Sequence, residues 1–370
     1  MRGIRIAAFA LCGIAVAVPN PQTINIEAAL AVPTPTILGP KIEDTAVLPV
    51  SYDPVAAVIA VAKAIATSGV ETKKLKRAAC DVQPGGVGPV PGDGSVGAYT
   101  NVNGQLRKNA RAVSTPTGYK KVFTDKLAAT EQIGHLTYKN IDSGKYDVNE
   151  CAKFCDKEKY CLGFNIYYER DPKREPAAAC PNPSPITNVK CSIYGYHITE
   201  NSATNAGQKR QNFQVAITGS NGYSKVGHTC HPAPSVKNFK PPTDLPAAIN
   251  APLIKKNGRD YDTYNGMRLF NTNPHDPSLC GAACEAQTEY DRKNLVNSRG
   301  EYKPCNFFTS YILTKNGVPL GTYCALYTQE WNPSYATNTG YKDGNDVYKV
   351  TCAASYTASK LDSGKITTTP

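Results

Sequence analysis

Cysteine is the residue type in this chain whose spacing points most clearly to chemistry, namely disulfide pairing. The chain has 13 cysteines, and Cys12 lies in an apolar leader, which leaves an even number in the rest. An even count is what a fully oxidised protein requires. Eight of these cysteines form two runs of one motif, in which Cys-x3-Cys is followed by Cys-x2-Phe and then Cys-x2-Tyr. The runs are Cys151, Cys155, Cys161 and Cys191, and then Cys280, Cys284, Cys305 and Cys324.

Residues suited to acid–base or metal chemistry are few. The chain has 5 histidines, and it contains no Gly-x-Ser-x-Gly elbow, no His-Glu-x-x-His helix and no Gly-x4-Gly-Lys-Ser/Thr loop. Nearby carboxylates such as Asp147 and Glu150 flank the Cys-x3-Cys pairs, where they suit helix caps. We therefore expect no enzyme activity, no cofactor and no metal. A secreted hydrolase with two facing carboxylates in a cleft is a less favoured alternative.

The N-terminus has the pattern of a secretory signal. Residues 1–5 are basic, and the apolar run that follows to Val18 is too short to cross a bilayer of about 30 Å as a helix. Ala15-Val16-Ala17 fits a small-x-small signal-peptidase site. We expect a signal peptide at residues 1–17, with cleavage after Ala17 and no integral membrane segment.

The next region differs from the rest of the chain. Residues 18–77 contain no cysteine, and their apolar stretch at 55–66 predicts one short helix. The region ends in Lys76-Arg77, which resembles a kexin or furin processing site. We expect a propeptide at 18–77, and a solvated basic turn is the alternative reading of the Lys-Arg pair.

The elements that must position the cysteines can be placed from the sequence. Residues Asp147–Glu158 and Asp276–Thr288 predict short helices, because each opens with a capping Asp and puts two cysteines at i and i+4. Strands are expected at 119–123, 161–169, 191–198 and 212–217, and again at 262–269, 305–313, 324–329 and 346–351.

A turn shared by both runs supports duplication. Asn205 and Asn338 each lie 14 residues after their cysteine, Cys191 or Cys324, inside an Ala-Thr-Asn-x-Gly sequence. The parts outside the repeat are a Gly- and Pro-rich arm at 78–118, expected to be irregular, and a tail at 357–370, expected to be disordered.

The Cys-x3-Cys helix with its Cys-x2-Phe and Cys-x2-Tyr strands resembles the PAN/apple domain. The resemblance implies an α+β fold of two disulfide-stapled modules, at 119–222 and 230–356, each a curved antiparallel sheet cradling a short helix. The pairs it implies are Cys151–Cys191, Cys155–Cys161, Cys280–Cys324, Cys284–Cys305 and Cys230–Cys352. With these assigned, Cys80 is left to pair with Cys180. The second copy departs from the first, with 20 residues between Cys284 and Cys305.

Tyrosine is the abundant aromatic residue, with 22 Tyr against 9 Phe and 1 Trp. A rigid ring with a polar tip suits stacking on sugars and contact with proteins, although alternating tyrosines also fill half-buried strands. For the two asparagines of the repeated turn, fixing the turn is the stronger expectation. The candidate ligand-binding residues are Tyr194, Tyr196, Asn205, Trp331, Tyr335 and Asn338.

The net charge of +11 is scattered along the chain. A nucleic-acid-binding protein would gather its lysines and arginines on one face, so no nucleic-acid partner is expected. The arrangement resembles fungal secreted proteins whose leaders end in Lys-Arg. We expect a secreted, non-catalytic protein, extracellular or associated with the cell wall, that binds a polysaccharide, glycoprotein or protein ligand. A structural cell-wall or matrix protein is the alternative.

Overall fold

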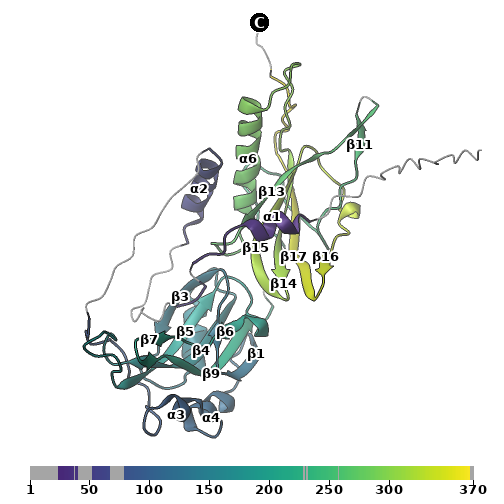
Figure 1. The fold of residues 1–370 in the computed structure, drawn as a ribbon. Coiled ribbons are helices and arrows are strands. Elements are labelled where there is room, and N and C mark those ends of the chain that lie inside the picture. Colours follow the sequence, from purple (N-terminus) through teal and green to yellow (C-terminus); the bar gives the residue numbers. More distant parts are fainter. Residues whose placement is uncertain are drawn as a thin grey trace, which may run out of the picture.

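The computed structural model describes residues 24–36, 38–40, 52–66, 79–227, 230, 232–256 and 258–366. Over these ranges the chain is a mixed α/β protein of mostly antiparallel sheets with few helices. Figure 1 shows two sheet-containing units, the first in teal and the second in green to yellow. The expected processing residues Ala17, Lys76 and Arg77 lie outside the described residues.

The first unit is built on five antiparallel strands with a helix across one face. The strand order is β1-β9-β4-β5-β3. In that order the strands span Tyr119–Lys126, Ala216–Lys225, Gly163–Pro172, Pro185–Tyr194 and His135–Asn140. The helix α5 (Val148–Asp156) begins at Asp147, whose side chain accepts a hydrogen bond from the Glu150 N–H at 3.0 Å. Its two cysteines are fully buried.

The second unit repeats this order. Its path is β10-β17-β14-β15-β13, and β16 (Gly340–Asp343) lies beside β17. In path order the strands span Thr243–Asp244, Asp346–Thr357, Phe307–Lys315, Val318–Tyr327 and Tyr264–Phe270. Helix α6 (Pro277–Asn294), capped by Asp276, takes the place of α5. The repeat seen in the cysteine spacing is therefore also a repeat of sheet topology.

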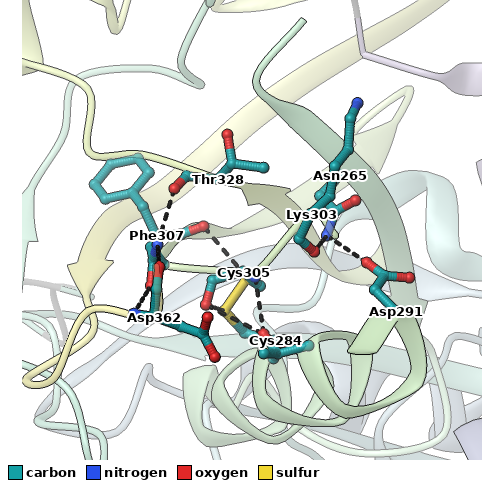
Figure 2. The surroundings of a disulfide bond; sticks show 10 residues. Asn265, Cys284, Asp291, Lys303, Cys305, Phe307, Thr328 and Asp362 are labelled. Atoms are coloured by element: carbon teal, nitrogen blue, oxygen red, sulfur yellow. Dashed lines mark hydrogen bonds between the residues drawn. A yellow bond between two sulfur atoms is a disulfide. The ribbon is translucent and has the colours of Figure 1, made fainter. Parts of the chain in front are cut away.

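Six disulfide bonds are present among the described residues. They are Cys80–Cys180, Cys151–Cys191, Cys155–Cys161, Cys230–Cys352, Cys280–Cys324 and Cys284–Cys305. Five of these are the pairs that the resemblance implies, and Cys80–Cys180 joins the two cysteines that were left over. In each unit one bond ties the helix to a strand of the sheet, and a second ties the helix to the residue that precedes the central strand. Figure 2 shows the second kind, Cys284–Cys305, between α6 and the start of β14.

Each sheet has a helix face and an opposite face, called here the far face. In the first unit Phe164 and Ile166 of β4 join the core around the α5 cysteines. Because successive strand residues point to opposite faces, Asn165 and Glu169 lie on the far face, where both are buried. The far face of the first sheet is therefore largely polar.

The far face of the second sheet is aromatic instead. Phe308 packs with the α6 cysteines on the helix face. Phe307, Tyr311 and Tyr323 belong to a separate cluster on the far face, where the two tyrosine rings stack at 4.8 Å. Chain segments from outside the sheet, including residues 245–251, cover this cluster.

Part of the expected irregular arm is helical. Residues 96–112 form α3 (Val96–Thr100) and α4 (Gln105–Ala112). Leu106 is 2 % exposed and Ala110 is fully buried, because they lie at i and i+4 on the face of α4 that packs on the first sheet. The Gly- and Pro-rich composition that predicted an arm is confined to the residues before α3.

The expectation of a disordered tail fails for residues 358–366, which pack on the second unit. The Asp362 carboxylate accepts a hydrogen bond from the Tyr302 hydroxyl at 2.8 Å and pairs with Arg292 at 2.6 Å. Its carbonyl accepts a hydrogen bond from the Asn306 side chain at 2.9 Å, and Figure 2 shows Asp362 beside the Cys284–Cys305 bond. The tail thus supports the longer helix and loop that fill the 20-residue spacing of the second copy.

The described parts of residues 24–66, inside the expected propeptide, lie against the two units. They contain α1 (Ile26–Ala31) and α2 (Pro54–Ala66). The second of these confirms the helix predicted at 55–66. Figure 1 shows α1, in purple, across the strands of the second unit and α2 near α6.

Candidate functional site

Most of the aromatic residues proposed for ligand binding are buried, so for them this expectation is wrong. Tyr194 is fully buried, Tyr196 is 1 % exposed and Trp331 is 6 % exposed. Their polar tips are used inside the fold. The Tyr194 hydroxyl donates to the Thr130 carbonyl at 2.7 Å, and the Trp331 Nε1 donates to the Thr263 hydroxyl at 3.0 Å. These side chains are core residues with satisfied hydrogen bonds.

The two asparagines of the repeated turn close that turn. The Asn205 side chain accepts a hydrogen bond from the Gly207 N–H at 2.9 Å, and the Asn338 side chain accepts one from the Gly340 N–H at 3.1 Å. The identical local geometry explains why the same sequence occurs in both copies. Of the six candidates, Tyr335 alone is an exposed side chain, at 39 %.

A pocket of about 520 Å³ opens on the first unit. It lies between α4, the irregular residues that precede α3, and the loop that leads into α5. The floor is formed by Tyr146, which is 8 % exposed, and Tyr168, which is 1 % exposed, and their ring centroids are 4.9 Å apart. The two rings therefore lie beneath the pocket and offer little free surface. Around it stand the polar side chains of Asn109, Ser143 and Lys145 and several small apolar ones. The volume lies in the range of small-molecule sites.

Helix α4 forms one wall of the pocket and is fixed to the sheet by charge as well as by packing. Arg107 pairs with Asp125 of β1 at 2.8 Å, and Arg111 pairs with the same carboxylate at 2.5 Å. Two cations from successive turns of one helix therefore hold a single partly buried aspartate. Asn109 lies between the two arginines in the sequence of this anchored helix.

The tyrosine floor is held by hydrogen bonds. The Tyr146 hydroxyl lies 2.8 Å from the Ile166 carbonyl and 2.5 Å from the Gly219 carbonyl, so it is used within the fold. Tyr168 accepts a hydrogen bond from the Asn109 side-chain amide at 3.3 Å. Burial raises the pKa of both tyrosine hydroxyls above the ordinary value, so both stay protonated at neutral pH.

The pocket therefore offers polar side chains at its rim above a base of buried tyrosine rings. Ser143 and Lys145 are exposed, and Asn109 is half-buried. An amide, a hydroxyl and an ammonium around an aromatic floor can bind a ligand with several hydroxyl groups. The sequence did not single out this pocket. The one available signal is Tyr146, a large aromatic residue placed directly before the helix cap Asp147.

A second polar cluster lies on the far face of the first sheet. The Lys190 ammonium is 2.5 Å from Glu169 and 3.9 Å from Asp171, and all three side chains are buried. Burial raises the pKa of Glu169 to about 8, and the neighbouring Asp171 adds to the rise. Asn188 donates to Asp171 at 2.7 Å and completes the cluster.

The described part of the chain offers neither a cluster of metal ligands nor a helix that could span a membrane. No group of three or more His, Cys, Asp or Glu side chains there could hold a metal ion. No helix in those ranges is long and apolar enough to cross a membrane. Comparison with family models, with curated proteins and with solved structures finds no match to this chain.

Proposed function

We propose that this chain is a secreted, non-catalytic binding protein of two PAN/apple-like modules, and that the first-unit pocket binds a saccharide unit of a cell-wall or cell-surface glycan. The carrying observation is that pocket, in which the accessible polar side chains of Asn109, Ser143 and Lys145 surround a base of buried tyrosines. Two sheets of the same strand order, each stapled to its helix by two disulfides, support the family assignment. Disulfides support an extracellular location.

A polysaccharide pull-down with the secreted full chain tests the proposal. Beads of chitin, β-glucan and mannan are compared for the fraction of protein retained. Ala112→Trp fills the pocket from the exposed end of α4, and Lys145→Gln removes the rim cation. The matched controls are Ala206→Trp and Lys153→Gln, because both of these positions are exposed and neither lines the pocket.

The proposal predicts that one polymer retains the wild-type chain. Retention should fall at least about tenfold in Ala112→Trp, since a ligand that loses its site loses more than about 1.4 kcal/mol of binding free energy. Lys145→Gln should weaken retention by a smaller factor, and the two controls should match the wild type. Equal retention of all variants would place binding elsewhere. No retention on any polymer would favour a structural role in the wall or matrix.

A further inference from the structure

The described parts of residues 24–66 form a strap that contacts both units. At one end, Ala29 of α1 is 3 % exposed and packs into the aromatic cluster on the far face of the second sheet, together with Ile24 and Ile26. The Asn25 N–H donates a hydrogen bond to the Tyr323 hydroxyl at 3.2 Å. The strap therefore covers part of an aromatic surface.

The middle of the strap lies where the two units meet. Leu38 packs with Tyr196 of the first unit and Ile312 of the second, and its carbonyl accepts a hydrogen bond from the Gln132 N–H at 2.9 Å. Tyr52, further along the strap, also contacts both units. Its hydroxyl donates to Asp276, the cap of α6, and its ring meets Tyr160 edge-on at 4.9 Å.

Helix α2 occupies a groove on the second unit. Val61 is 8 % exposed and packs against Leu279, Ala282 and Ala283 of α6. Small residues on the α6 side allow a helix to approach closely. The opposite side of α2 is apolar too, with Val55 67 % and Ile59 62 % exposed. A helix that is apolar on both sides is unusual on a protein surface, where one side is normally polar.

The fit of α2 in this groove is incomplete. An open pocket of about 650 Å³ lies between α2 and the end of β13, lined by Ala56 and Ala60 of the helix and by Phe270 and Arg268 of the strand. Asp53, which caps α2, lines the same pocket as Arg268, so a negative charge at the start of the helix complements the groove.

A helix that packs on a groove through one apolar side is held there in part by its covalent connection to the body. A short flexible link gives an effective concentration in the millimolar range, and cutting the link removes that advantage. The sequence places a Lys76-Arg77 pair between the strap and the first cysteine of the body. Cleavage after Arg77 would convert an intramolecular contact into a bimolecular one.

We propose that the strap masks a helix-binding groove formed by α6 and β13, and that cleavage after Arg77 frees it for an apolar, alanine-rich helix of a partner protein. The partner helix carries an acidic residue at its start, opposite Arg268, and larger side chains where α2 has Ala56 and Ala60. The proposal depends on processing at the Lys-Arg pair and is independent of saccharide binding by the first-unit pocket.

The test uses the full chain with a sequence-specific protease site placed at residues 72–77. After cleavage, native mass spectrometry at nanomolar protein measures whether the strap leaves the body, and circular dichroism measures whether the body stays folded. A labelled peptide of residues 52–66 then serves as the helix probe. Its variants are Val61→Asp on the inner side, Ile59→Asp on the outer side as the matched control, and Ala60→Leu, which fills the pocket beside α2.

The strap should leave a folded body, and the peptide should bind again. Val61→Asp should weaken peptide binding at least about tenfold, because a buried valine is lost and a charge is introduced. Ile59→Asp should change binding less than about twofold, and Ala60→Leu should tighten it. A strap that stays bound at nanomolar concentration, a body that unfolds without it, or equal weakening by the two aspartates would each overturn the proposal.

Discussion

The two disulfides of helix α5 should differ in how much they stabilise the first unit. Cys151–Cys191 joins residues 40 apart in the sequence, whereas Cys155–Cys161 joins residues only 6 apart. All four cysteines are at most 1 % exposed, so burial is closely matched between the two bonds. The remaining difference is the length of the loop that each bond closes in the unfolded chain.

The chain-entropy relation turns these lengths into free energies. For a loop of 40 residues the stabilisation is about 3.9 kcal/mol at 25 °C, and for a loop of 6 residues it is about 2.2 kcal/mol. Replacing both cysteines of a pair by alanine removes the bond with similar losses of buried surface. The Cys151→Ala/Cys191→Ala variant should therefore be less stable than Cys155→Ala/Cys161→Ala by about 1.7 kcal/mol.

Urea unfolding followed by far-ultraviolet circular dichroism measures this difference. Trp331 is the single tryptophan and lies in the second unit, so its fluorescence provides an internal control that should be less affected by either variant. The reasoning would be refuted if the two double variants had the same free energy of unfolding, or if loss of the short bond cost more.

Three further predictions concern particular packing and charge features. Glu169→Gln should flatten the dependence of unfolding free energy on pH between about pH 5 and 8, measured by urea unfolding. The pKa of Glu169 is raised to about 8 in the folded protein, so the wild type loses stability as the pH rises from the pKa of the unfolded chain towards about 8. A variant whose unfolding free energy had the same slope against pH as the wild type would contradict this. Leu106→Ala should cost about 2–5 kcal/mol in a urea titration, because α4 is part of the core, whereas the exposed Val102→Ala should cost little. Asp362→Ala should release the last described residues at a cost of about 1 kcal/mol, seen as faster hydrogen exchange at 358–366; protection equal to that of the wild type would show that Asp362 is no anchor.

The helices and central strands could be predicted because their determinants are local. Asp147 and Asp276 cap helices in the sequence positions where capping residues are expected, and the i, i+4 cysteines follow from helical spacing. The second helix extends beyond its predicted end at Thr288, to Asn294. Strand β3 was not predicted, because its six residues, HLTYKN, show only a short apolar–polar alternation.

The candidate site could not be predicted from the same pattern, because burial of a tyrosine depends on distant parts of the chain. The Tyr194 hydroxyl lies beside Gly39 and the Thr130 carbonyl. The Tyr323 hydroxyl accepts a hydrogen bond from the backbone N–H of Asn25, which is nearly three hundred residues away in the sequence. An alternating strand looks the same in sequence whether its outer face meets solvent or another segment. The two tyrosines of the pocket floor lie 22 residues apart in the sequence, and their rings meet only because the loop before α5 packs on β4.

The contrast between the two far faces makes the units non-interchangeable despite their shared framework. One carries a buried lysine–carboxylate cluster and the other a stacked tyrosine pair, although strand order and the helix disulfides are the same. A duplicated scaffold whose stability comes from covalent staples tolerates such divergence, since the surface opposite the helix is free to change composition. The molecule is therefore a pair of specialised copies, and exchanging strands β4 and β14 between them would leave charges facing aromatic rings.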